Sequence, residues 1–201
     1  NINISDTSQC TGVPLAFTVV NNGTIDADTA GRTITVAAAL INSASGQIKV
    51  GPGNVTINGF DGNSGTIAQT GGTLTFGGST KLASLGTYTR SAGSVALAGV
   101  ADLASSSWSP LGAWTISGTI QNGTVNLALG TLTFPALCTY GRLSNVTVNG
   151  DLPNFTGGLR WNNVTLNGTL TATGQGEIVF EGNQSLSGAI AANTTSTLAL
   201  A

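Results

Sequence analysis

The stretch Val55-Thr56-Ile57-Asn58-Gly59 decides the fold, because the same five-residue pattern returns along nearly the whole chain. Its first and third residues are large and apolar, the second is usually Thr, and a small residue and Gly usually follow. This alternation is typical of a β-strand with one buried face, so we interpret each copy as one strand. Clear copies begin at Leu74, Val95, Trp114, Leu132, Val146, Val164 and Ile178, with looser ones at Ile2, Phe17, Ile34 and Leu198.

The spacing of the copies indicates how the strands are connected. Most successive copies end 14 to 21 residues apart. This spacing exceeds a tight hairpin and leaves too little chain for a crossover helix with its loops. It suits one turn of a solenoid in which like strands stack in parallel. The predicted fold class is therefore all-β, a single-stranded parallel β-helix (β-solenoid) of about 12 coils of 14–21 residues.

Handedness and domain organisation follow from the same pattern. Parallel crossovers are almost always right-handed, so we expect a right-handed coil. A left-handed hexapeptide helix is the alternative, although its strict six-residue sides fit the uneven spacings poorly. The composition does not shift along the chain, which predicts a single β-solenoid domain over residues 1–201, with residues 1–30 as an irregular N-terminal cap.

Charge is scarce and excludes several classes of function. The chain has six Lys and Arg, eight Asp and Glu, no His and a net charge of −2. The basic residues are scattered and form no stripe that follows a phosphate backbone, so we expect no nucleic-acid partner. No apolar run is long enough for a membrane helix, so we expect no membrane insertion. Without His the usual zinc and iron sites are missing, and we expect no cofactor or metal.

Ten Asn-x-Ser/Thr sequons suggest the compartment, because such sites accept N-linked glycans in a secretory pathway. They lie at Asn3, Asn22, Asn54, Asn122, Asn145, Asn154, Asn163, Asn167, Asn183 and Asn193. Their number exceeds what the composition alone predicts, so we expect an extracellular or cell-surface glycoprotein. The alternative is a corner Asn followed by a strand, which would account for Asn54, Asn145 and Asn163 without any sugar.

Cys10 and Cys138 are the two cysteines and are disulfide candidates in an oxidising compartment. Stacked coils would hold them far apart, because successive coils add about 4.8 Å each and a disulfide needs Cα atoms within about 7 Å. Three possibilities stay open. The N-terminal segment runs back along the solenoid, each cysteine bonds to a neighbouring subunit, or both remain free thiols.

Catalysis has few candidate residues. The absence of His removes the Ser-His and Cys-His nucleophile schemes. Asp26 and Asp28 form a same-face carboxylate pair near Arg32, which is the arrangement that polysaccharide cleavage or calcium binding would use. A lone pair of this kind in an irregular region is more often a solvated turn, and we interpret Glu177 and Glu181, which flank a single strand, in the same way. We therefore assign no catalytic residue and expect no enzyme.

Threonine at the centre of most copies predicts an outward ladder of hydroxyl groups. Such rows resemble those of ice-binding β-solenoid proteins, which usually carry Thr-x-Thr arrays. Here each copy supplies one Thr, and Ala96 and Val179 interrupt the row. The preference of Thr for strands and for cross-strand contacts accounts for the ladder without a ligand.

The Gly-terminated, Thr-centred repeat resembles the β-helical stalks of secreted and cell-surface adhesins, including filamentous-haemagglutinin-like and autotransporter-passenger regions. The resemblance covers nearly the whole chain and concerns architecture. It implies a non-catalytic extracellular scaffold. The sequon excess and the cysteine pair depart from the bacterial pattern and favour a eukaryotic surface or matrix glycoprotein.

Both ends of the chain carry strand-like pairs, Ile2 with Ile4 and Leu198 with Leu200. Exposed solenoid ends leave backbone groups and the apolar column uncovered. We therefore expect head-to-tail self-association into a fibre, filament or surface coat. A glycan- or receptor-binding adhesin module is the alternative, with surface glycans as partners of exposed Tyr88, Tyr140, Trp108 and Trp161, and a polysaccharide-cleaving β-helix enzyme is third.

Overall fold

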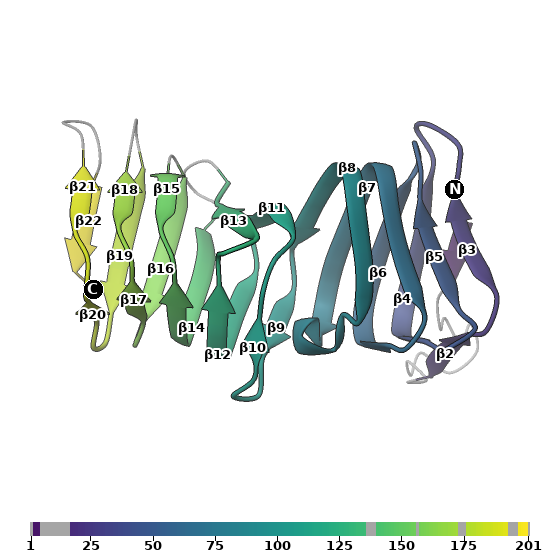
Figure 1. The fold of residues 1–201 in the computed structure, drawn as a ribbon, viewed down its shortest axis with the longest axis horizontal. Helices are drawn as coiled ribbons and strands as arrows, with labels where there is room; N and C mark the ends of the chain where they lie inside the picture. Colours follow the sequence, from purple (N-terminus) through teal and green to yellow (C-terminus); the bar gives the residue numbers. More distant parts are fainter. Residues whose placement is uncertain are drawn as a thin grey trace, which may run out of the picture. The chain divides into compact units, whose positions relative to one another are not determined.

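The computed structural model describes residues 2–4, 17–135, 140–155, 157–172, 176–192 and 197–200. The chain is an all-β parallel β-solenoid of about eight turns, and the residues described contain no α-helix. It contains two compact units, Asn1–Gly99 and Val100–Ala201, and each is described by itself. In each unit short strands lie one above another in parallel (Figure 1).

Three parallel ladders form the sides of the N-terminal unit. The first joins β1 (Ile2–Ile4) and the start of β4 (Thr33–Asn42) to the start of β6 (Asn54–Asn63), the middle of β7 (Thr66–Thr80) and the end of β8 (Thr87–Leu97). The second joins β2 (Thr18–Asn21) to the ends of β4, β6 and β7. The third joins β3 (Thr24–Ala27) and β5 (Gln47–Val50) to the starts of β7 and β8, and a 3-10 turn covers Leu82–Ser84.

The C-terminal unit repeats this scheme. One ladder joins β9 (Val100–Asp102) and the starts of β12 (Thr119–Asn126) and β14 (Tyr140–Asn149) to β16 (Gly158–Asn162), β19 (Glu177–Glu181) and β22 (Thr197–Leu200). A second joins β10 (Ser107–Trp108) and the ends of β12 and β14 to β17 (Thr165–Asn167) and β20 (Ser185–Leu186). β11 (Gly112–Ile116) pairs with β13 (Gly130–Thr133), and β15 (Leu152–Phe155), β18 (Leu170–Ala172) and β21 (Ile190–Ala192) form a separate sheet.

The core of each unit is a stack of apolar side chains. Val36, Ile57, Phe76 and Leu97 are register partners on four successive turns, and each is fully buried. The residue before each of them in the pattern is half-buried on the outer side, as Thr56 is. The predicted strand, with apolar residues inward and Thr outward, is confirmed. Burial of such columns is the main stabilising contribution in this architecture.

The predicted count of 12 coils is wrong, because the five-residue pattern does not stay on one side of the solenoid. Register partners from Thr18 onward are 17 to 23 residues apart, for example Ser107 with Thr124 and Thr124 with Thr147. The short spacing of 14 residues between Leu132 and Val146 arises because their strands, β13 and β14, belong to different ladders. Counting every copy as a coil therefore overestimated the number of turns.

Part of the predicted N-terminal cap is regular solenoid. β2 and β3 lie within residues 1–30 and pair in parallel with β4 and β5. Phe17-Thr18-Val19, a looser copy of the pattern, falls on the second ladder instead of the first. Handedness and the single-domain organisation stay predictions.

Candidate functional site

Within the part of the chain that the structure describes, the densest group of charges lies on the outer side of β14, β16 and β19 in the C-terminal unit. Arg142 and Arg160 are register partners on adjacent turns, so two like charges stack directly. Glu181 joins them, since its carboxylate oxygens accept from Arg142 Nη2 at 2.6 Å and from Arg160 Nη1 at 2.8 Å. The side chains of Arg142 and Arg160 are 38% and 42% exposed, and that of Glu181 is 20% exposed.

Tyr140 and Glu177 extend this charged cluster. The Arg160 guanidinium lies 5.0 Å from the centre of the Tyr140 ring, within the range of a cation–π contact. The Tyr140 hydroxyl donates to a carboxylate oxygen of Glu177. The five side chains form one connected network that contains two of the six basic and two of the eight acidic side chains of the protein. Its two positive and two negative charges balance.

The arrangement of the cluster favours a structural or recognition role. Glu177 and Glu181 are four residues apart on one strand, which separates them by about 13 Å at roughly 3.3 Å per residue. Paired carboxylates of glycoside hydrolases are about 5 to 9.5 Å apart. Glu181 is also occupied by two arginines. The geometry therefore does not match the carboxylate pair of a hydrolase.

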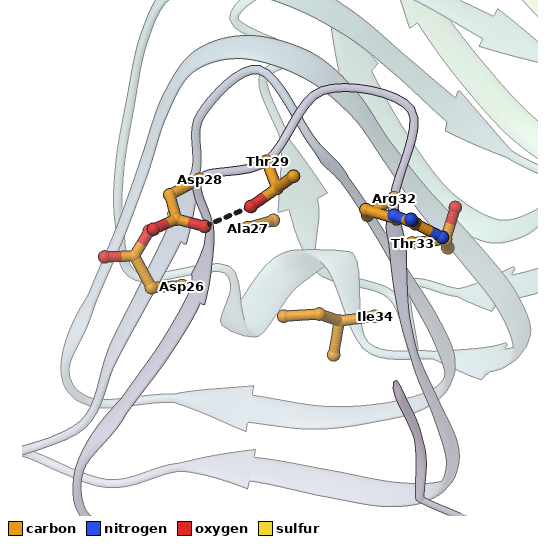
Figure 2. Close-up of a pocket in the computed structure, with 7 residues that line it drawn as sticks. All are labelled: Asp26, Ala27, Asp28, Thr29, Arg32, Thr33 and Ile34. Atoms are coloured by element: carbon orange, nitrogen blue, oxygen red, sulfur yellow. Dashed lines mark hydrogen bonds between the residues drawn. The ribbon is translucent and has the colours of Figure 1, made fainter. Parts of the chain in front are cut away.

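Asp26 and Asp28, the predicted carboxylate pair, line a surface pocket of about 260 Å³ in the N-terminal unit. Figure 2 shows both carboxylates on one side of this pocket and Arg32 on the other. All three side chains are exposed, and Asp28 Oδ1 accepts from the Thr29 hydroxyl at 2.8 Å. Among the described residues neither carboxylate is in an ion pair with Arg32. The structure thus brings the three residues to one pocket without joining their charges.

Of the four aromatic residues proposed as sugar platforms, two are buried and the other two, Tyr88 and Tyr140, are half-buried. Trp108 is 4% exposed and Trp161 is fully buried, which contradicts their predicted exposure. Trp108 packs edge-on against Trp114, with ring centres 4.8 Å apart, and Trp161 packs on Phe180. Tyr88 is half-buried and its hydroxyl donates to Gln69 Oε1 at 2.8 Å. Burial raises the pKa of Tyr88 to about 12, partly offset by Arg90.

Asparagine side chains form columns that sequence reasoning did not find. In the N-terminal unit, Asn21 Nδ2 donates to Asn42 Oδ1 and Asn42 Nδ2 donates to Asn63 Oδ1, both at 2.7 Å. Asn42 is fully buried and also donates to the carbonyls of Gly46 and Thr66 at 3.2 Å. These residues recur every 21 positions, and that period is the signal that could have identified the column.

Two further columns lie in the C-terminal unit. In the first, Asn145 Nδ2 donates to Asn122 Oδ1 at 3.3 Å and Asn163 Nδ2 donates to Asn145 Oδ1 at 3.1 Å. In the second, Asn149 donates to Asn126 and Asn167 donates to Asn149, both at 2.8 Å. Four of the ten predicted glycan acceptors, Asn122, Asn145, Asn163 and Asn167, are therefore members of hydrogen-bonded columns.

Asp102 closes the first of these columns. Its Oδ2 accepts from Gln121 Nε2 at 2.9 Å and from Asn122 Nδ2 at 3.0 Å, and its Oδ1 accepts from the Ala104 N–H at 2.9 Å. These hydrogen bonds, with that from Gln121 the largest cause, lower the pKa of the Asp102 carboxyl. A carboxylate therefore ends a chain of amides whose donors all point toward it.

The remaining sequons divide into three groups. Asn22 and Asn183 have exposed side chains that make no hydrogen bond within the described part of the chain. Asn54 is half-buried and its Oδ1 accepts from the Thr73 N–H at 2.9 Å. The side chains of Asn3 and Asn154, and all of Asn193, lie outside what the structure describes, as do Cys10 and Cys138. Glycosylation and the disulfide stay predictions.

The predicted assembly end at the C-terminus is exposed. Leu198 and Leu200 are 48% and 90% exposed, although their register partners Ile178 and Phe180 face the interior. Leu200 borders a pocket lined also by Phe180, Gly182, Gln184, Leu186 and Ile190. The side chains of Ile2 and Ile4 lie outside the described residues, while their backbone pairs with β4.

Within the described residues there is no group of three or more Asp, Glu, Cys or His side chains placed to hold a metal ion. In the same part of the chain no helix is long and apolar enough to cross a membrane. Comparison of the sequence and structure with protein-family models, curated proteins and solved structures finds no match. The fold supports the resemblance to secreted β-helical stalks only at the level of β-solenoid architecture, and no family is identified.

Proposed function

We propose that this protein is a non-catalytic structural subunit of an extracellular fibre, filament or cell-surface coat that assembles by end-to-end stacking of solenoids. Parallel ladders in regular register support this proposal, because a further turn of the same kind can extend them by backbone hydrogen bonds. The outer positions are mainly short polar residues, which give a hydrated and weakly charged surface.

The exposed apolar residues of β22 carry the proposal. The interior column that passes through Leu143 and Trp161 is fully buried, yet at Leu200 the same column is 90% exposed. At the first turn Val19 and Ile25 are only half-buried, whereas their partners Leu40 and Ile48 are fully buried. A second copy that stacks on either surface would remove these side chains from water.

Sedimentation and electron microscopy at rising protein concentration test this assembly. The wild-type chain should form particles that lengthen with concentration. Leu200→Lys places a charge in the proposed junction and should raise the concentration for half-assembly by at least about tenfold, since a buried unpaired charge is costly. Leu129→Lys is the matched control, because Leu129 is 65% exposed on a turn of the same unit. Monomers at every concentration, or equal effects of both lysines, would overturn the proposal.

A second candidate function is binding to ice, and two columns of mainly hydroxyl-bearing residues on one side of the N-terminal unit favour it. Residues two positions before the central Thr also face outward, which creates Thr33-x-Thr35 and Thr73-x-Thr75 pairs on the first ladder. Asn54 with Thr56, and Ser94 with Ala96, fill the other two turns. On the first three of these turns polar groups thus repeat at about 4.8 Å across strands and about 6.6 Å along them, and Ala96 interrupts the array on the fourth. We propose that this two-dimensional array orders water.

Thermal hysteresis and the shape of ice crystals test the second candidate. Thr56→Lys should abolish both effects, because the longer side chain disrupts the array. Thr89→Lys is the control, since Thr89 is exposed on the third ladder of the same unit. Absence of hysteresis and crystal shaping in the wild-type protein would exclude ice binding.

A further inference from the structure

Four sequons of the C-terminal unit occupy the same corner of four successive turns. Their hydroxyl residues Thr124, Thr147, Thr165 and Ser185 are register partners on adjacent strands. Their asparagines, Asn122, Asn145, Asn163 and Asn183, come two residues earlier in every case. The Asn-x-Ser/Thr pattern here therefore coincides with a structural repeat, a corner residue followed by the first outward position of a strand.

The backbone of this corner favours asparagine for a reason independent of glycosylation. Asn122, Asn145 and Asn163 have φ values of 58°, 53° and 52°, in the left-handed region. Among residues with a side chain, Asn tolerates this region best, because its short amide does not obstruct the backbone. Stacking of the amides then satisfies their donors and acceptors from turn to turn.

An N-linked glycan requires the same nitrogen atom that these columns use. The Nδ2 atoms of Asn122, Asn145 and Asn163 each donate to the preceding turn, and the Nδ2 of Asn167 does so in the second column. Turns stacked about 4.8 Å apart leave no room for a sugar between successive amides. A glycan replaces one of the two N–H groups of Nδ2, and the sugar on that nitrogen would crowd the amide of the neighbouring turn, so a glycan transferred before folding would hinder closure of the column.

Asn22 and Asn183 differ from the column residues in their hydrogen bonding and not in their exposure, since Asn145, Asn163 and Asn167 are exposed as well. Within the described residues neither the Asn22 nor the Asn183 side chain makes a hydrogen bond. Asn183 follows the last amide of the first column, and only its backbone N–H is used, donating to Asn163 Oδ1 at 2.9 Å. A glycan on either nitrogen would project into solvent.

We infer that Asn22 and Asn183 are the sites of N-linked modification among these six sequons, and that Asn122, Asn145, Asn163 and Asn167 are unmodified structural residues in the folded protein. This inference rests on the proposed extracellular route, which exposes the chain to glycosylation. It does not depend on end-to-end assembly, so particle size in microscopy and glycan position report on the two proposals separately.

Glycopeptide mass spectrometry of the full chain, secreted from a eukaryotic host and purified as folded protein, tests the inference. We expect glycans at Asn22 and Asn183 and unmodified peptides at the four column positions. Molecules modified at Asn145 or Asn163 should appear only in the retained, unfolded fraction. A glycan at a column residue in the folded fraction, or bare Asn22 and Asn183, would overturn the assignment.

Stability of glycan-free protein from bacterial cytosol tests the column itself. Asn145→Gly keeps the left-handed backbone accessible and removes only the stacked amide with its two hydrogen bonds, to Asn122 and from Asn163. Because both bonds are exposed and each contributes little, the equilibrium constant for unfolding should rise roughly tenfold. Asn22→Gly is the matched control at an exposed sequon and should change the equilibrium constant for unfolding less than about twofold. Equal effects of the two substitutions would contradict a structural role for Asn145.

Discussion

Asn21 donates its side-chain amide to the side-chain oxygen of Asn42, one full turn later in the chain, across 2.7 Å. The side-chain amide of Asn42 in turn donates to the side-chain oxygen of Asn63 and to the carbonyls of Gly46 and Thr66. The column thus ties three turns of the N-terminal unit together. Since Asn42 is fully buried, the polar groups that it contacts are shielded from bulk water and depend on this side chain for their hydrogen bonds.

We expect Asn42→Ala to destabilise the protein by about 2 to 4 kcal/mol, because several buried polar groups lose their partner at once. Urea unfolding followed by circular dichroism measures the change. Asn22→Ala is the control and should cost less than about 0.5 kcal/mol, since Asn22 is exposed. Similar losses for both variants would show that the column contributes no more than an exposed Asn.

Glu181→Gln should destabilise the protein by about 1 kcal/mol, because Arg142 and Arg160 then stack without a compensating charge. The effect should shrink at high salt, and Arg142→Gln in the same chain should offset it, since it removes one of the two like charges. Thermal unfolding at low and high salt measures both effects. Lys81→Gln breaks the more exposed pair with Asp61 and should be nearly neutral. A salt-independent loss would contradict the electrostatic explanation.

Asp102 should make stability depend on acid pH. Its folded pKa lies below the ordinary value of 3.8, so its contribution is present above that value and is lost as the pH falls through the lowered pKa. Asp102→Asn should therefore be less stable than wild type at neutral pH, and the difference should narrow in acid. Gln121→Ala removes the largest cause of the shift and should weaken the dependence. Unfolding curves at several pH values measure the stability difference between wild type and Asp102→Asn. A difference that stays constant with pH would refute the role of the Asp102 carboxylate.

Tyr88 should make stability depend on alkaline pH. Its folded pKa is about 12 against an ordinary 10.0, so its contribution is complete below pH 10 and is lost as the pH rises toward 12. In the Tyr140→Phe background, ultraviolet absorbance of the phenolate should show Tyr88 ionising near pH 12. Tyr88→Phe should flatten the alkaline decline in stability. Ionisation near pH 10 in the folded protein would contradict the burial of this hydroxyl.

The fold class could be predicted from the sequence because the alternation around Val55-Thr56-Ile57 reports local geometry. The side of the solenoid on which a copy lies depends on the lengths of the corners between strands. The copies at Leu132 and Val146 look alike and yet belong to different ladders. Corner lengths leave no periodic trace in side-chain hydropathy, which is why the number of turns was wrong.

The charged cluster was not found because its members are far apart in sequence. Arg142 and Glu181 are 39 residues apart and meet only through the register of three strands. The burial of Trp161 was predictable, since it alternates with outward Arg160 and Asn162 on one strand. The wrong prediction that Trp161 is exposed rested on its aromatic character. The alternation of inward and outward positions along the strand indicates instead that Trp161 faces the core.

The direction of the ladders determines how the N-terminal unit would respond to mechanical force. Its strands lie across the stacking direction, so tension along that direction loads the hydrogen bonds of one turn at a time (Figure 1). Turns would peel off in sequence, and each one leaving the stack would also break an amide contact such as that between Asn21 and Asn42. A tether built this way yields gradually under load and dissipates work instead of rupturing in a single event.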